Sequence, residues 1–169
     1  FAIFSDQHKG ARDLADDFRV SEKNYITALD HYFENGFHFI NLGDCEELWE
    51  NKPDIVLEKN QADLKAEVRF QKNNRYYRVF GNHDLEWKYE LTRSRYLKPL
   101  FGDQLKVYEG VLLTTRYNNR DYSILCSHGH QGDQKSDGNM FSTWVVAHIW
   151  TPLQRFLEIS INSTSDSFE

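Results

Sequence analysis

Four short polar clusters contain the residues of this chain whose types and spacing could do chemistry. They are Asp6-Gln7-His8, Gly43-Asp44-Cys45-Glu46-Glu47, Gly81-Asn82-His83-Asp84 and Ser127-His128-Gly129-His130. An aspartate and a histidine at alternate positions of an extended segment can point to the same side, where both could bind one metal ion. Taken alone, each cluster also has an ordinary interpretation as a polar turn, and for Asp6-Gln7-His8 by itself the turn is favoured.

Taken together, the four clusters favour a site for two metal ions. Their ligands combine carboxylate and amide oxygen with imidazole nitrogen, a mixture that suits Mn, Fe or Zn better than Ca. Asp44 has two carboxylate oxygens and could bridge two cations. Paired cations about 3.5–4 Å apart can clamp a phosphoryl group and generate hydroxide from bound water. The residues therefore indicate phosphoryl chemistry.

Apolar segments before the clusters predict the elements that position them. We expect strands at 1–4, 37–42 and 76–80, and helices at 21–35, 54–72 and 86–97. Ligands bind at the carboxyl ends of strands in open α/β sheets, so the clusters at these ends should converge on one patch. Gly43, Gly81 and Gly129 let the backbone turn sharply where a side chain must be aimed at the site.

The second half of the chain predicts antiparallel additions to this pattern. Two β-like runs, 105–117 and 121–127, flank the turn Asn118-Asn119-Arg120 and indicate a hairpin. Residues 139–159 should be helical, with a kink at Pro152. The predicted class is α/β (α+β layered), with β-α-β-α-β first and antiparallel strands later.

Composition and charge exclude several classes of protein. The 169 residues, 40% of them hydrophobic, predict a single globular domain over 1–169. A net charge of −6 argues against a nucleic-acid partner. The apolar stretch 141–161 contains His148, Arg155 and Glu158, which excludes a membrane-spanning helix. Two cysteines and no visible signal peptide predict a cytoplasmic location.

The clusters resemble, in order, the motifs of the calcineurin-like metallophosphoesterase superfamily. Its D-x-H, G-D-x-x-D/E and G-N-H-D/E motifs correspond to the first three clusters, and its lone histidine corresponds to His128. The resemblance implies a β-sandwich flanked by helices. The sequences ADDF (15–18), GDCEELW (43–49) and HGHQGD (128–133) look most similar to the UDP-2,3-diacylglucosamine pyrophosphatase-like branch.

The resemblance implies a metal ligand set. Its members are Asp6 and His8 for one ion, Asn82 and His128 for the other, and Asp44 as the bridge. The superfamily pattern then continues with G-H-x-H, which supplies one imidazole to each metal and does not follow His128 here. Three explanations stay open: the sequence stops short of the motif, His130 replaces one ligand, or the site binds one metal or none. We favour the first, since the chain also starts without Met, and expect both ends of the domain to be incomplete.

Further roles come from residues beside these ligands. By resemblance, His83 would protonate or stabilise the leaving oxygen, with Asp84 orienting it and keeping it cationic. Glu47 would support a metal ligand from behind, or simply start a helix. Lys9 and Arg12 would contact the substrate phosphate, or else lie in a solvated loop.

The expected function is dinuclear-metal-dependent hydrolysis of a small or lipid-linked phosphodiester or pyrophosphate, with Mn first and Fe or Zn next as the metal. The alternatives are a nuclease-like or protein-phosphatase-like member of the same superfamily, and a non-catalytic remnant that binds metal or a partner. Residues 139–160 could form a helical cap that receives an acyl chain, although a core or dimer helix is favoured there. Peripheral membrane contact and the oligomeric state are left open.

Overall fold

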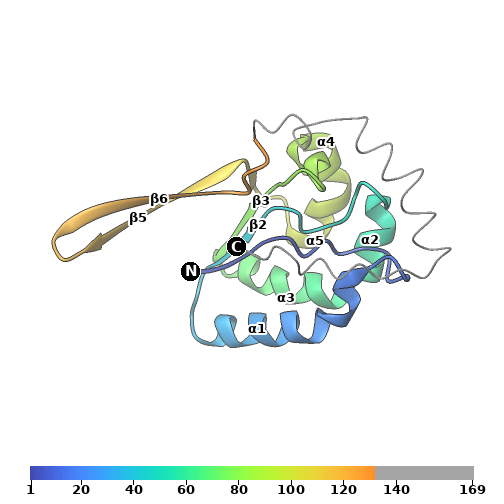
Figure 1. Ribbon diagram of the computed structural model, residues 1–169, viewed down its shortest axis with the longest axis horizontal. Helices are drawn as coiled ribbons and strands as arrows, with labels where there is room; N and C mark the ends of the chain where they lie inside the picture. The colour runs from blue at the N-terminus through green and yellow to red at the C-terminus, as the bar shows by residue number, and fades with distance from the viewer. Residues whose placement is uncertain (132–169) are drawn as a thin grey trace, which may run out of the picture.

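The computed structural model describes residues 1–131 and builds them around a four-stranded parallel sheet (Figure 1). The strands lie in chain order: β1 (Ala2–Phe4), β2 (Phe39–Leu42), β3 (Tyr76–Val79) and β4 (Val107–Tyr108). The register pairs Phe4 with Asn41 and Asn41 with Arg78, so the first three strands end at one edge. The three predicted strands are confirmed, each within two residues at its ends.

Helices α1 (Glu22–Glu34) and α3 (Gln61–Lys72) lie side by side along the sheet (Figure 1). Leu29 of α1, Phe39 of β2 and Phe70 of α3 are fully buried in the main hydrophobic cluster. The predicted helix at 21–35 is therefore confirmed as α1. Ser21 is its N-cap residue, although the serine side chain makes no capping hydrogen bond, and a 3-10 turn, η1 (Asp17–Val20), precedes it.

The helix predicted over 54–72 is divided in two, which corrects the sequence-based expectation. Helix α2 (Pro53–Lys59) begins with its proline at the first turn, where no backbone N–H is needed, and α3 starts after Asn60. The buried Asn60 side-chain amide donates to the carbonyl oxygens of Gly10 and Val56 at 2.8 Å. The break therefore ties the helical layer to the loop after β1.

The helix predicted over 86–97 is also broken. In its place are η2 (Leu85–Lys88), α4 (Glu90–Thr92), the π-helical η3 (Arg93–Leu97) and α5 (Lys98–Phe101). The Arg93 guanidinium donates to the carbonyl oxygens of Trp87 and Lys88 at 2.7 Å, which satisfies backbone acceptors at the first break. Gly102, with φ of 93°, ends the segment.

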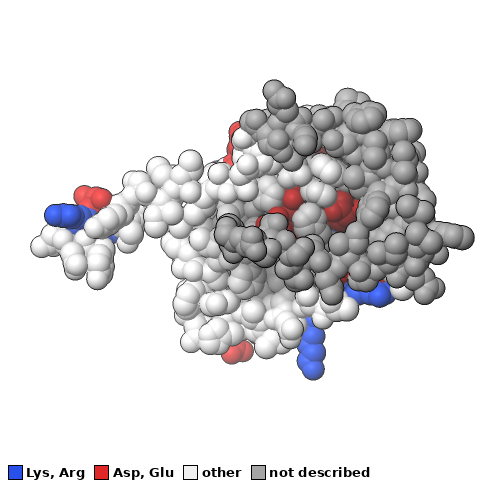
Figure 2. Space-filling view, viewed as in Figure 1, with Lys and Arg blue, Asp and Glu red and all other residues white. Residues whose placement is uncertain are grey.

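The predicted hairpin is confirmed as β5 (Gly110–Tyr117) and β6 (Arg120–Ser127). Asn118 and Asn119 have φ of 49° and 59°, the left-handed pair that a two-residue type I′ turn requires. The run predicted at 105–117 is divided, because its first part joins the parallel sheet as β4. The hairpin projects from the rest of the chain, with its charged atoms gathered at the far end (Figures 1 and 2).

The mixed α/β class is confirmed, with a parallel sheet, helices and a separate antiparallel hairpin. The described part of the chain thus has the mixed strands and helices that the resemblance implied, but within residues 1–131 the strands form one parallel sheet and one hairpin and not the expected β-sandwich. The helix predicted at 139–159, its kink at Pro152 and the cap at 139–160 lie outside the described residues. No helix within residues 1–131 is long and apolar enough to cross a membrane.

Candidate active site

The loops after β1, β2 and β3 are hydrogen-bonded to one another at the carboxyl edge of the sheet. The backbone N–H of His8 donates to the carbonyl oxygen of Asp44 at 2.9 Å, and that of Asp6 to Gly43 at 3.1 Å. The N–H of Leu48 donates to the carbonyl of His83 at 3.1 Å. These bonds bring three of the four polar clusters onto one patch.

Asp44 is the centre of this patch. Its Oδ1 accepts the backbone N–H of His83 at 2.9 Å, while Oδ2 lies 3.1 Å from His128 Nε2 and 3.6 Å from His8 Nε2. Burial raises the pKa of this carboxyl, but the hydrogen bond from His128 and the charges of the nearby imidazoles outweigh it, and the pKa is lowered overall. The carboxylate is therefore held ionised.

Two groups of potential ligand atoms share Asp44. One consists of His8, Asp44 and His83, and the other of Asp6, Asp44 and His128; within each group the atoms lie within 4.8 Å of one another. All of these donors are carboxylate oxygens or imidazole nitrogens, which fits borderline divalent metals. The arrangement could hold two cations with Asp44 between them.

His128 reaches the site from the loop directly after β6. Its Nδ1 lies 3.0 Å from the carbonyl oxygen of Leu42, which can only accept, so Nδ1 carries the hydrogen and Nε2 faces Asp44. Burial lowers the pKa of this imidazole, but the Asp44 carboxylate raises it to about 9 overall. The hairpin thus contributes a ring whose Nε2 faces Asp44, and a metal ion bound there would displace the Nε2 proton.

Glu47 holds two imidazoles at once. Its Oε2 lies 2.9 Å from Nδ1 of His8 and 2.7 Å from Nδ1 of His83. Burial raises the pKa of Glu47, but the two histidine hydrogen bonds lower it overall. Burial lowers the pKa of His8, but the hydrogen bond and charge of Glu47, with the charges of Asp44 and Asp6, raise it overall. Because both Nδ1 atoms are engaged, the Nε2 atoms of both rings are left for chemistry.

Trp49 fixes the other side of His83. The two rings stack with centroids 3.9 Å apart and an interplanar angle of 16°. The indole Nε1–H also donates to the carbonyl oxygen of Asn82 at 2.7 Å. Asn82 and His83 are therefore held from behind by one aromatic residue.

Backbone strain is concentrated in the same loops. Asp6, His8 and Asp44 have φ of 58°, 48° and 50°, in the left-handed region that non-glycine residues seldom adopt. Such strain clusters at functional sites, where the surrounding structure over-determines the conformation. Here it aims three potential ligands at one point.

Two glycines permit the close approach of side chains to the loops. A Cβ on Gly81 would lie 2.1 Å from Asp44 Oδ1, and one on Gly43 would lie 2.6 Å from the His128 ring. Both contacts are far shorter than any real Cβ contact. The glycines were predicted as turn residues, and here they also make room for the ligand side chains.

Several predicted site residues lie elsewhere. Lys9 is fully buried and its ammonium binds Glu67, so the structure does not place it where a substrate phosphate could reach. Arg12 pairs with Asp63 at 2.6 Å and Glu22 at 2.8 Å. The two displacements have the same physical cause, because carboxylates of α1 and α3 form ion pairs with these cations.

Asp84 and His130 also differ from their expected places. The Asp84 carboxylate is fully buried and accepts from the backbone N–H groups of Gly81 at 2.6 Å and Cys45 at 2.9 Å. It is Glu47, three residues after Asp44, that bonds the His83 ring. His130 is buried beside His128, with ring centroids 5.5 Å apart, but neither of the two ligand groups contains it.

Comparison with known proteins identifies the family. A sequence model of the calcineurin-like phosphoesterases matches residues 1–168, which includes all four polar clusters. No curated protein and no solved structure matches the chain significantly. The match spans well over half of the chain and agrees with the mixed α/β fold and the Asp/His groups at the sheet edge. The chain belongs to the calcineurin-like phosphoesterase family, whose members are metal-dependent hydrolases.

Proposed function

We propose that the chain hydrolyses a small or lipid-linked phosphodiester or pyrophosphate with two divalent metal ions. The observation that carries this proposal is the central place of Asp44, which belongs to both ligand groups. When bound there, the cations would neutralise the charge of the phosphoryl group and activate water. Following the resemblance, we assign Asp6 and His8 to one ion, Asn82 and His128 to the other, and Asp44 to both. The two ligand groups of the structure instead combine Asp6 with His128 and His8 with His83. The pairing of Asp6 with His8 is supported by the 3.9 Å between Asp6 Oδ1 and His8 Nε2.

We assign His83 the role of the acid for the leaving oxygen. Glu47 engages its Nδ1 and Trp49 stacks on its ring, so Nε2 is the atom that would donate the proton. This proposal transfers the orienting role from Asp84 to Glu47, because the ring-to-carboxylate contact is made by Glu47. Asp84 acts instead on the backbone of the loops.

The metal, branch and compartment are part of the same proposal. The mixed oxygen and nitrogen donors favour Mn²⁺, with Fe and Zn as alternatives. The similarity to the UDP-2,3-diacylglucosamine pyrophosphatase-like branch supports a lipid-linked pyrophosphate among the candidate substrates. Cys45 and Cys126 are unpaired and buried, in agreement with a reducing compartment such as the cytoplasm.

The deciding experiment measures turnover of the full chain with Mn²⁺ on a panel of substrates. The panel contains an aryl phosphodiester, a nucleoside diphosphate sugar, a lipid-linked pyrophosphate, a phosphopeptide and single-stranded DNA. We expect activity on the diester or a pyrophosphate, lost in His83→Ala and in Asp44→Asn. Turnover of DNA or the phosphopeptide alone would favour the nuclease-like or phosphatase-like alternatives, and no turnover with any divalent metal would contradict the proposal.

Metal titration separates the two roles open to His83. If His83 acts as an acid, the His83→Ala variant should bind Mn²⁺ within about threefold of the affinity of the unsubstituted chain, while its kcat falls by about 100-fold or more. If His83 is a metal ligand, the His83→Ala substitution should lower the Mn²⁺ affinity as strongly as Asp44→Asn does. Arg69→Met is the matched control, because its ion pair with Asp30 joins α1 to α3 away from the site.

A further inference from the structure

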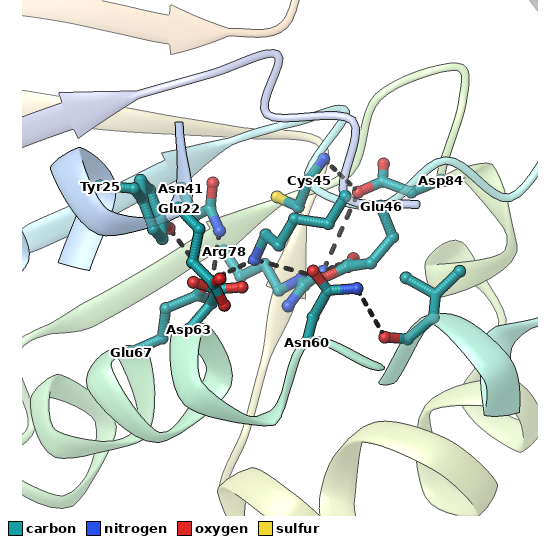
Figure 3. A network of polar contacts seen from close by, with 12 residues as sticks. Glu22, Tyr25, Asn41, Cys45, Glu46, Asn60, Asp63, Glu67, Arg78 and Asp84 are labelled. Atoms are coloured by element: carbon teal, nitrogen blue, oxygen red, sulfur yellow. Dashed lines mark hydrogen bonds and ion pairs between the residues drawn. The ribbon is translucent and has the colours of Figure 1, made fainter. Parts of the chain in front are cut away.

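A buried ionic network is formed in part by chain neighbours of the candidate-site residues, and Figure 3 shows its polar contacts. We call it the basal network; its members are Lys9, Glu46, Glu67, Arg78 and Asp84. All five are 0% exposed. Charged side chains are almost never fully buried unless they are paired, so this concentration calls for a role.

Two cations organise the basal network. The Arg78 guanidinium donates to Glu46 and lies 3.9 Å from Asp84 Oδ2. The Lys9 ammonium donates to Glu67 and lies 3.6 Å from Glu46 Oε1. Glu46 is the carboxylate that both cations share.

The network is anchored in the rigid part of the fold. Arg78 lies within β3, and Glu67 lies on α3. The hydroxyls of Tyr25 and Tyr76 donate to Glu67 at 3.0 and 2.7 Å. One side of the network is therefore fixed by the core of the domain.

The other side of the network is formed by the loops of the site. Three of its members are chain neighbours of residues that face the site: Lys9 follows His8, Glu46 precedes Glu47, and Asp84 follows His83. In each pair, one side chain contacts other residues of the site and its chain neighbour contacts other members of the basal network. The network thus holds three separate loops at the residue adjacent to the chemistry.

Asp84 links two of these loops through their backbones. Its carboxylate accepts the N–H of Gly81, after β3, and the N–H of Cys45, after β2. Arg78 lies beside this carboxylate and bonds Glu46 on the β2 side. The guanidinium therefore contacts both the loop that carries Glu47 and the loop that carries His83.

We propose that Arg78 is a positioning residue for phosphoester hydrolysis, acting through Glu46 and Asp84 on the Glu47–His83 contact without touching substrate. Buried ion pairs are weak sources of stability, and apolar replacements of similar volume are often neutral or stabilising. A displacement of about 1 Å at reacting groups can cost about 100-fold in rate. Placement of the loops is thus the larger expected contribution of Arg78.

The inference rests on the proposed function of the same site, and its test uses the full chain with Mn²⁺ in three variants. Arg78→Lys keeps the charge and loses the guanidinium fork. Glu46→Gln with Arg78→Met removes one charge of each sign, so that Glu46 is not left as an unpaired buried ion. Arg69→Met removes an arginine from the interhelical pair with Asp30 and serves as the control.

We expect kcat to fall about tenfold or more in Arg78→Lys and in the double variant, with KM changed by less than about threefold. The control should retain its kcat. Thermal unfolding monitored by circular dichroism shows the fraction of folded protein, to which each kcat is normalised. A folded double variant with a normalised kcat within about twofold of the unsubstituted chain would overturn the inference and leave Arg78 with a role in folding alone.

A second readout does not depend on turnover. In ¹H–¹⁵N spectra of the imidazoles, the Nδ1–H signals of His8 and His83 report their bonds to Glu47. We expect these signals to shift or broaden in Arg78→Lys, while the amide signals of α1 stay in place. Unchanged imidazole signals in a folded variant would overturn the inference even if the unsubstituted chain showed no activity. Absence of activity with shifted signals would instead contradict the proposed function alone.

Discussion

The carboxyl edge of the parallel sheet and the β5–β6 hairpin are built in opposite ways. At the sheet edge, short irregular loops have left-handed backbones and buried charges. The hairpin has two strands of eight residues in a regular ladder, and several of its apolar side chains face outward, with Leu112 61% and Leu125 70% exposed. The loops are held by side-chain contacts in addition to backbone hydrogen bonds, whereas the hairpin is held by its own backbone ladder.

This difference teaches where the molecule is sensitive to substitution. A regular ladder tolerates changes at exposed side chains, because its hydrogen bonds do not involve them. At the sheet edge, single side-chain atoms add links between loops to those of the backbone, so the loss or addition of one such atom should change the site. The two regions meet at His128, where the end of the hairpin reaches Asp44. Substitutions in the two regions should therefore differ in effect by orders of magnitude.

A matched pair of glycine substitutions should give the largest contrast. In Gly81→Ala the new Cβ would lie 2.1 Å from Asp44 Oδ1 and 2.6 Å from its backbone nitrogen, and the backbone cannot yield. We expect kcat/KM with Mn²⁺ to fall by about 100-fold or more. In Gly110→Ala, on the hairpin, the nearest atom is the Cys126 carbonyl oxygen at 3.1 Å. Equal losses in the two variants would contradict the contrast.

Removal of the Glu47 charge should have the next largest effect. A neutral glutamine side chain cannot offer the charge-assisted hydrogen bonds that the Glu47 carboxylate makes to His8 and His83. In Glu47→Gln we expect kcat to fall by about 10- to 100-fold. Steady-state kinetics measure this fall, with Glu58→Gln on α2 as the control, since Glu58 contacts only Lys59 at 4.0 Å among the ion pairs of the described residues. A variant with unchanged kcat would remove Glu47 from the mechanism.

The pH dependence of stability should sharpen the comparison at the junction of the two regions. His128 has its pKa raised to about 9, so the metal-free protein gains stability from its pair with Asp44 fully below about pH 6.5 and loses it as the pH rises toward 9. We expect the free energy of unfolding in EDTA to fall by about 2 kcal/mol over this interval, because one pH unit corresponds to about 1.4 kcal/mol and solvent screens part of the pair.

Urea unfolding at several pH values measures this fall. His128→Asn should show a flatter profile between pH 6.5 and 9, since the titrating partner of Asp44 is gone. A profile equally steep in both proteins would place the titration elsewhere. His8, whose pKa is also raised, would then be the first group to substitute.

Hairpin substitutions should have the smallest effect. In Leu125→Thr we expect kcat/KM within about twofold of the unsubstituted chain and a free energy of unfolding within about 0.5 kcal/mol, because the side chain is mostly exposed. Kinetics and urea unfolding measure both. A tenfold loss of activity without unfolding would show that this face contacts substrate, and the contrast between the two regions would fail.

The strands and the convergence of their polar ends could be predicted from sequence, because each signal is local. An apolar run followed by Asp-x-His or Gly-Asn-His-Asp indicates both the strand and its exit. The hairpin was equally predictable, since Asn118 and Asn119 tolerate the left-handed conformations that its turn requires. Local patterns suffice where the determining residues are close in the chain.

The remaining features depend on distant partners and could not be predicted in this way. The apolar period runs through 54–72, and the break at Asn60 reflects its bond to Gly10, 50 residues earlier. Lys9 is next to the site in sequence, but Glu67, 58 residues away, draws it beneath the sheet edge. Which acid meets the His83 ring depends on how the β2 and β3 loops dock, and docking selected Glu47 over the adjacent Asp84.

The left-handed backbones of Asp6, His8 and Asp44 restrict how this site can evolve. Asp, Asn and His are enriched in that conformation relative to other non-glycine residues, and β-branched residues are strained there. Drift at these positions is thus channelled toward residues that can still bind a metal. Exchange of Asp for Asn at these positions would remove a charge and keep a residue that tolerates the left-handed conformation, so the charge of the site could change without added backbone strain.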